Sequence, residues 1–352
     1  MRQSLIVFSI SLLLLTSCEK PEPTLFETLD AEQTGIDFIN RSLEKDDFNI
    51  FNYRNFYNGG GVAIGDVNND GLSDIYVTSN FEDNILYLNK GDFKFEDITE
   101  KSGVNGKKFW STGATFADVN GDGLMDIYVC NSGSRDERGN QLYINQGVEN
   151  GTPVFTEIAE EAGLLDGGYS THAAFFDYDR DGDLDMYLLN NSFTPIDKLG
   201  FMNLRENRDK LGGDKLFRND SDGTTIKFTD VSEEAGIYGS LIGFGLGITI
   251  GDVNNDNWPD IYISNDFYER DYLYINQRNG TFKDDLESQM PHTSLSSMGA
   301  DIADINNDGL LDIFVTDMLP ADDRRLKTTS VFEGYNLVEL KKKKGFWHQY
   351  MR

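Results

Sequence analysis

The chain has 352 residues and a formal net charge of −29, from 60 Asp and Glu against 31 Lys and Arg. This charge argues against a surface for nucleic acid or anionic membrane, because such surfaces need clustered Lys and Arg. The 39% of hydrophobic residues allow a sizeable core, and 35 Gly with abundant Asn and Asp favour a turn-rich all-β fold. With only two cysteines, the chain has no network of disulfides to support its fold.

Residues 1–17 have the pattern of an export signal, with a basic start followed by an apolar run from Leu5 to Leu15. The next residues complete Leu15-Thr16-Ser17-Cys18, which resembles the lipobox of bacterial lipoproteins. That resemblance implies that Cys18 is lipidated and becomes the first residue of the mature chain; the alternative is an ordinary cleaved signal. We therefore expect residues 18–24 to form a tether and the protein to be lipid-anchored in the bacterial cell envelope, at the outer membrane or cell surface.

The rest of the chain is organised by five copies of one nine-residue pattern, whose first aspartates are at positions 66, 118, 177, 252 and 304. A Gly- and Ala-rich apolar stretch precedes each copy, and a short apolar run such as 75–78 follows it. Such runs predict strands that are buried on both faces. Two further elements, first seen at 86–89 and 95–99, recur in the first four units. The sequence therefore predicts four strands per unit.

A four-stranded sheet repeated around an axis is the blade of a β-propeller. We predict such a propeller over residues 25–352, with about five blades visible. Residues 25–29 resemble a fourth strand without its three predecessors, and 346–351 lie where a third strand of the fifth unit is expected. Either the N-terminal strand completes a five-bladed ring, or the chain is the first part of a longer protein.

The nine-residue pattern has the chemistry of a cation-binding loop. Side-chain oxygens at positions 1, 3, 5 and 9 and a backbone carbonyl at position 7 can surround one hard cation, while Gly at position 6 permits the sharp turn. An all-oxygen set suits Ca²⁺ and offers no soft ligand for zinc. We predict about five Ca²⁺ sites. Their ligands are Asp66, Asn68, Asp70, Leu72 and Asp74; Asp118, Asn120, Asp122, Leu124 and Asp126; Asp177, Asp179, Asp181, Asp183 and Asp185; Asp252, Asn254, Asp256, Trp258 and Asp260; and Asp304, Asn306, Asp308, Leu310 and Asp312.

Other uses of such a loop fit less well. A single copy in a chain rich in Asn and Asp is as consistent with a turn as with a site, but five copies in register indicate sites. An EF-hand needs flanking helices and Glu at position 12, where the first copy has Val77. The fourth copy departs from the pattern, since Asn257 replaces Gly and Pro259 precedes the last aspartate.

These loops and strands resemble the FG-GAP/VCBS repeats of integrin-α-type propellers. The order of elements also resembles bacterial lipoproteins related to cartilage acidic protein, in which the propeller precedes an ASPIC/UnbV domain; residues 213–219 and 348–352 share that resemblance. No ASPIC/UnbV segment is present in this sequence. The resemblance therefore implies a chain truncated at its C-terminus, with an incomplete propeller.

An insertion in the third unit, residues 192–215, is the candidate ligand-binding element because it brings aromatic and basic residues to an acidic molecule. Those residues are Phe193, Phe201, Arg205, Arg208 and Lys210; the alternative is a segment that merely covers the rim. Identical carboxylate sets in every repeat favour structure over catalysis. We expect a non-enzymatic module that binds a protein or glycan outside the cytoplasm and no nucleic acid. The alternative is a lyase-like, polysaccharide-active enzyme on the same scaffold.

Overall fold

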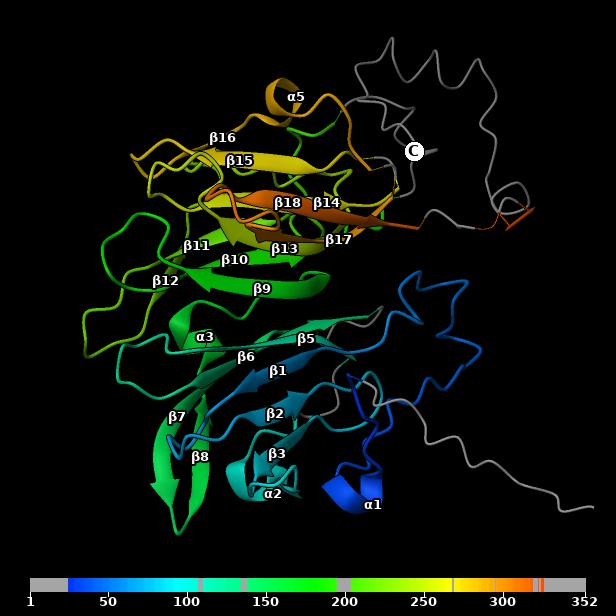
Figure 1. Ribbon diagram of the computed structural model, residues 1–352, viewed down its shortest axis with the longest axis vertical. Helices are drawn as coiled ribbons and strands as arrows, with labels where there is room; N and C mark the ends of the chain where they lie inside the picture. Colours follow the sequence, from blue (N-terminus) through cyan, green and yellow to red (C-terminus); the bar gives the residue numbers. More distant parts are fainter. Residues whose placement is uncertain are drawn as a thin grey trace, which may run out of the picture.

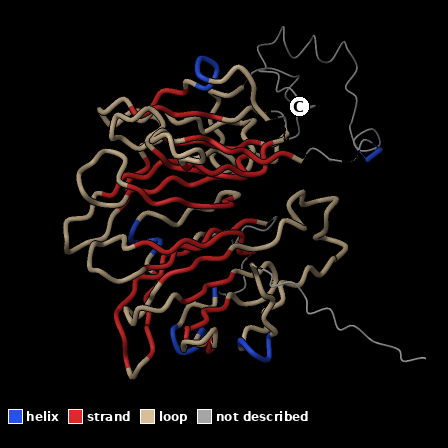
Figure 2. Tube along the Cα trace, in the orientation of Figure 1, coloured by secondary structure: helices blue, strands red, loops and turns tan. Residues whose placement is uncertain are grey.

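The structure is a computed structural model that describes residues 25–106, 110–133, 138–194, 204–267, 269–294, 296–318, 322 and 324–325. Strands make up most of its regular structure, and the helices are single turns (Figure 2). Over these residues no helix has the length and apolar character that crossing a bilayer requires. The predicted signal, the lipidation site Cys18 and the expected strand at 346–351 all lie outside the described residues.

Four antiparallel sheets of four strands follow one another along the chain, and a two-stranded sheet follows them (Figure 1). We call them blades 1 to 5. Blade 1 is β1 (Val62–Gly65), β2 (Asp74–Val77), β3 (Ile85–Asn89) and β4 (Phe95–Asp97). Blade 2 is β5 (Trp110–Ala117), β6 (Asp126–Ser132), β7 (Gln141–Glu149) and β8 (Thr152–Glu157). Blade 3 is β9 (Ser170–Phe176), β10 (Asp185–Asn190), β11 (Lys215–Asn219) and β12 (Phe228–Asp230). Blade 4 is β13 (Gly245–Gly251), β14 (Asp260–Asn265), β15 (Tyr272–Asn276) and β16 (Phe282–Asp284), and blade 5 is β17 (Ser297–Ala303) and β18 (Asp312–Asp317).

The prediction of four strands in each of the first four units is confirmed, and each nine-residue loop joins the first strand of a blade to the second. Short helices follow the fourth strands of three blades. They are α2 (Thr99–Ser102), α3 (Ala159–Ala162) and α5 (Leu286–Gln289), while α1 (Ala31–Thr34) precedes blade 1. The fold class is therefore all-β with blades of the predicted kind, and the described sheets do not form a closed barrel.

The blades pack face to face, and their first strands approach one another because those strands are rich in glycine. A Cβ added to Gly61 would lie 2.7 Å from the Cα of Gly113 in the next blade, and one added to Gly247 would lie 2.9 Å from the Cα of Gly299. Larger residues fill the space farther out: Tyr76 and Leu86 of blade 1 share one core with residues of blade 2. Similar cores lie between the later blades.

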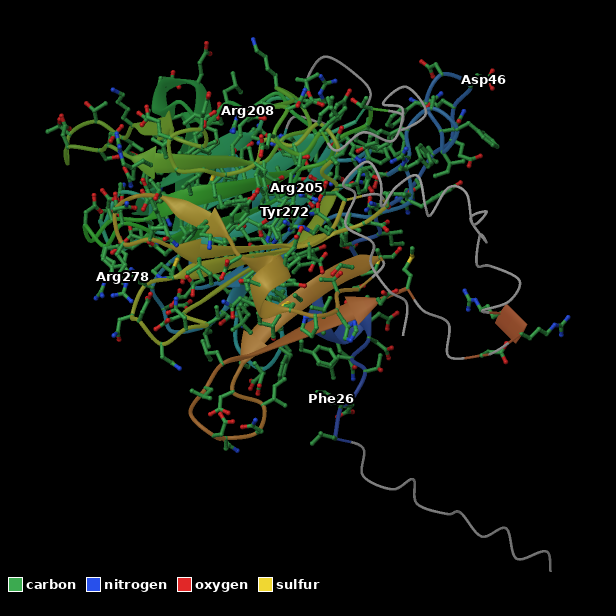
Figure 3. All side chains as sticks on the ribbon, turned by 90° about the horizontal axis from the view of Figure 1, so that it is seen from above. Phe26, Asp46, Arg205, Arg208, Tyr272 and Arg278 are labelled. Carbon is green, nitrogen blue, oxygen red and sulfur yellow. The ribbon has the colours of Figure 1, made fainter. Side chains whose placement is uncertain are left out.

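The N-terminal segment packs on blade 1 as the helical turns of later blades pack on their neighbours. A Cβ added to Gly35, after α1, would lie 2.5 Å from the Phe95 carbonyl oxygen, and one added to Gly163, after α3, would lie 2.7 Å from that of Phe228. The expected strand at 25–29 is not formed. Its Phe26 side chain is 85% exposed and projects from the body of the molecule (Figure 3). In the described residues the fifth blade has only β17 and β18, so no third strand supplies hydrogen bonds to residues 25–29.

A buried side chain at the start of the third strand holds the end of the second strand in each complete blade. In blade 3, Asp214 accepts hydrogen bonds from the Asn190 backbone N–H and the Tyr187 hydroxyl, both at 3.0 Å. In blade 1, Asn84 takes the same place: its Oδ1 accepts from the Ser79 N–H at 2.9 Å. Burial raises the pKa of the Asp214 carboxyl to about 7.

This difference between blades predicts a pH dependence. A carboxyl with an ordinary pKa of about 3.9 in the unfolded chain and about 7 in the folded one binds protons more tightly when folded. Its contribution to stability is therefore complete below about pH 4 and is lost as the pH rises through about 7. We expect Asp214→Asn to flatten the fall in melting temperature between pH 5 and pH 8. The reverse change in blade 1, Asn84→Asp, should steepen it, and unchanged slopes in both variants would contradict this account.

Candidate metal centres

All five loops share three internal hydrogen bonds. The position 1 aspartate accepts the backbone N–H of position 5 on Oδ1 and that of position 6 on Oδ2; in the first loop the donors are Asp70 at 3.1 Å and Gly71 at 2.7 Å. The position 5 aspartate accepts the N–H of position 7 on Oδ1, as Asp70 does from Leu72 at 2.9 Å. Position 6 has a positive φ in every loop, which Gly adopts easily and which Asn257 adopts at 67° in the fourth.

The position 9 aspartate clamps each loop to its blade. In blade 2, Asp126 accepts the Val119 N–H at 3.0 Å on one oxygen and the Asn145 N–H at 2.8 Å on the other. The matching aspartates of blades 1, 3 and 4 make the same two bonds and, like Asp126, are at most 1% exposed. Asp312 makes the bond to the loop, from the Ile305 N–H at 3.2 Å.

Burial of this carboxylate next to the other loop carboxylates disfavours its charged form. The pKa of Asp185 is raised to about 8, chiefly by burial, and those of Asp126 and Asp260 are raised to about 7 and about 6 for the same reason. A cation among these carboxylates would remove the penalty, because it favours the ionised form.

The third loop gives the most direct test of whether a cation fits. Each of Asp177, Asp179 and Asp185 offers a carboxylate oxygen within 4.8 Å of the others. The Oδ1 atoms of Asp179 and Asp183 are buried and accept no hydrogen bond from the described residues. Converging, desolvated oxygens that lack donors are what a hard cation requires. The donor set of this loop therefore fits Ca²⁺.

In the other loops the position 3 side chain is an asparagine. Asn68 accepts the Asp70 N–H on its Oδ1 at 3.2 Å, and its Nδ2 donates to the Asp70 Oδ2 at 3.0 Å; Asn120 lies in the same way against Asp122. The structure thus brings the side chains of positions 1, 3 and 5 together in each loop. The carbonyls proposed at position 7 belong to residues whose N–H groups already bond position 5.

The asparagine that ends each third strand of the complete blades is not among the site residues predicted from the sequence. The Asn145 side chain donates to the Val67 carbonyl of the preceding blade's loop at 2.8 Å. Asn219 and Asn276 make the same contact to Val119 and Tyr178, at 3.1 and 2.8 Å. The signal was available, because Asn closes the recurring element first seen at 86–89. The first three loops are thereby bound to the next blade as well as to their own.

The predicted ligand-binding insertion is held mostly against the molecule. Arg205 donates to one oxygen of Glu269 in blade 4 through Nε at 2.8 Å and Nη2 at 2.6 Å, and its side chain is only 10% exposed. Phe193 packs on an aromatic cluster with Tyr53, and Arg208 donates to the Ile237 carbonyl. Lys210 is exposed, and Phe201 lies outside the described residues. In the view of Figure 3 both Arg205 and Tyr272 fall within the body of the molecule, away from its edge. These contacts favour the covering role for the insertion.

A cavity of about 420 Å³ lies where the first strands begin, which is the end of each blade opposite the loops. Its wall includes Thr112, Thr171 and Met298 from three first strands. At the cavity, the Arg54 guanidinium stacks on the rings of Phe267 and Phe244, at 4.4 and 5.4 Å from their centroids. Arg54 makes no hydrogen bond with the residues that the structure describes, and Asp266 adds a carboxylate to the same wall.

Phe267 lines this cavity and has an unfavourable backbone conformation. Its φ is 65°, a value that bulky residues rarely adopt, and its side chain is 44% exposed. Strained residues that stay exposed often mark functional sites. The cavity is therefore a second candidate site, distinct from the five loops.

Comparison with known proteins agrees with this geometry. The family model for the FG-GAP-like repeat matches residues 66–129 and 252–315, which contain the first, second, fourth and fifth loops. Cartilage acidic protein 1 of Mus musculus is 26% identical over 273 residues, covering 72% of this chain and 39% of that protein. Integrin alpha-3 of Mus musculus is 33% identical over 99 residues, covering 24% of this chain and 9% of that protein. The chain thus spans well under half the length of either relative.

A weaker likeness links the chain to a solved structure, described as the basis of recognition of non-reducing terminal N-acetylglucosamine by an Agrocybe aegerita lectin. The TM-score is 0.34 at 19% identity, with 62% of this chain and 49% of that chain covered. A score of this size does not establish a common fold.

Blades, loops and matched repeats together define the class: this is an all-β chain of four-stranded blades that contains FG-GAP-like repeats at residues 66–129 and 252–315 and is similar to integrin alpha chains over part of its length. It is also similar to cartilage acidic protein 1 over 72% of this chain.

The position 9 clamp makes a prediction about stability. Asp126→Ala would leave two buried N–H groups without an acceptor, which should lower the free energy of unfolding by roughly 2–5 kcal/mol. The matched control is Asp122→Ala in the same loop, whose side chain is exposed, and a loss of about 1 kcal/mol or less is expected there. Urea unfolding in EDTA measures both, and equal losses would contradict the clamp.

Proposed function

We propose that this chain is a calcium-stabilised, non-enzymatic binding module that acts outside the cytoplasm, held at the bacterial cell envelope through a lipid on Cys18. The observation that carries the proposal is the repetition of one all-oxygen loop in five successive blades. Each loop forms the turn between the first and second strands of its blade. Ca²⁺ held by the carboxylates at positions 1, 5 and 9 would neutralise their mutual repulsion.

The cavity beside Arg54 is the proposed point of contact with a partner. Stacking on Phe267 and Phe244 positions the Arg54 guanidinium while leaving its N–H groups available. A guanidinium presents donors in a fork that matches a carboxylate. The partner is therefore expected to be a protein or glycan with a carboxylate-bearing group, and the hydroxyl and carboxylate groups on the wall suit further polar contacts.

Calcium should raise the melting temperature. A ligand bound by the folded chain alone stabilises it by about 4 kcal/mol per site at a thousandfold excess over its dissociation constant. We expect the melting temperature to rise with CaCl₂, to rise less with MgCl₂, which prefers a tighter octahedral shell, and to fall with EDTA. A melting curve that excess EDTA leaves unchanged would end the calcium part of the proposal.

The binding part can be tested with immobilised oligosaccharides, some rich in uronic acids and some neutral, together with acidic peptides. Arg54→Ala should weaken capture of the carboxylate-bearing probes at least tenfold. The control is Arg41→Ala. Arg41 is also exposed, but it does not line this cavity, and its guanidinium pairs with the Glu82 carboxylate at 3.3 Å. Equal capture by both variants would remove the cavity from the proposal, and release of unsaturated sugar ends would favour a lyase.

A further inference from the structure

The fourth loop differs from the others in having a cationic side chain on one of its candidate ligands. The difference begins in the turn after the third strand, two residues beyond the asparagine that ends it. In all four complete blades the N–H at this position donates to that asparagine. The residue is Gly91, Gly147 or Ser221 in blades 1 to 3, but Arg278 in blade 4.

Arg278 reaches back to the fourth loop. Its Nε and Nη2 donate to the Oδ2 of Asp256 at 3.1 and 2.8 Å. The side chain of Arg278 is 56% exposed and that of Asp256 only 11%, so the guanidinium covers the carboxylate from the solvent side. In Figure 3 Arg278 accordingly lies at the periphery, far from Arg205.

The identity of the oxygen matters. Asp256 uses Oδ1 to accept the Trp258 N–H at 2.8 Å, as position 5 does in every loop. Oδ2 is therefore the oxygen that the loop's own backbone leaves for a cation. In the first loop this oxygen, on Asp70, contacts only the neutral amide of Asn68 among the described residues. In the fourth loop a guanidinium occupies it.

A second arginine adds to the positive charge here. Arg180, from the third loop, donates to the Asn257 carbonyl at 3.0 Å, and its guanidinium lies 5.6 Å from the centre of the Trp258 ring. The fourth loop thus has three carboxylates at ligand positions and two arginines against it. Like charges repel, so both arginines disfavour entry of a divalent cation.

We propose that the fourth loop is the weakest calcium site of the five, because Arg278 takes the oxygen of Asp256 that the ion needs. This inference rests on the proposed calcium binding of the other loops. The loop still keeps the shared fold, with the Asp256 and Asn257 N–H groups on Asp252 at 2.9 and 2.7 Å. The Arg278 guanidinium therefore takes the place of the calcium ion at Asp256 and supplies a single positive charge there.

The test counts bound calcium by equilibrium dialysis and metal analysis. The wild-type chain should bind four ions tightly and a fifth at least tenfold more weakly. Arg278→Gly, which restores the residue of blades 1 and 2, should bring the fifth site within about threefold of the others. Arg41→Ser is the control: it removes an exposed arginine that pairs with Glu82 rather than with a loop carboxylate, and the count should not change.

The converse variant is Gly91→Arg. A Cβ added to Gly91 would meet no atom within 4 Å, and Arg278 has a positive φ at the equivalent position, so arginine can adopt this backbone conformation. It should weaken one further site, leaving three tight ions. Five equal sites in the wild type, or a fifth site that stays weak in Arg278→Gly, would overturn the inference alone. Binding of no calcium by any variant would instead overturn the proposed function on which it rests.

Discussion

The structure depends on one buried carboxylate in each complete blade. The aspartate at position 9 of each loop starts the second strand, and in the complete blades it accepts one N–H from the loop and one from the third strand. A single side chain thus fixes the loop, the first two strands and the third strand relative to one another. Its burial is costly unless its charge is offset, since the pKa of Asp185 rises to about 8. The same buried carboxylate therefore fixes the blade and gives the proposed cation its reason to bind.

Much of this organisation could be predicted from the sequence because it is local and repeated. The nine-residue loops, the apolar runs on both sides of them and the recurring third and fourth elements follow one another within 36 to 61 residues in each complete blade. A repeat also removes the ambiguity of a single match. The isolated segment at 25–29 had the right pattern without this support, and in the described structure it forms no strand because no neighbour pairs with it.

What could not be predicted depends on contacts between blades. Arg205 looked like a ligand-binding residue in an acidic chain, yet its partner Glu269 lies 64 residues away in the next blade. The cavity joins Arg54 to Asp266 and Phe267, and only the meeting of the first strands brings these segments together. Arg278 could be aligned with Gly91 from the sequence, but its bond to Asp256 requires the actual course of the side chain across the hairpin. Local patterns identify strands and loops. The sequence alone does not reveal which polar side chains already have a hydrogen-bonding partner elsewhere in the protein.

The asparagine that ends each third strand has a consequence for how the chain is made. The carbonyl of Val67 receives its bond from Asn145, 78 residues later, and those of Val119 and Tyr178 receive theirs from residues 100 and 98 positions later. On the ribosome, a finished loop must therefore wait for most of the following blade to emerge. Contacts of this sequence separation slow folding. Each of these blades is therefore expected to complete its contacts only after the next blade has been synthesised. Until then, the loop carbonyl of the most recently made blade bonds to water.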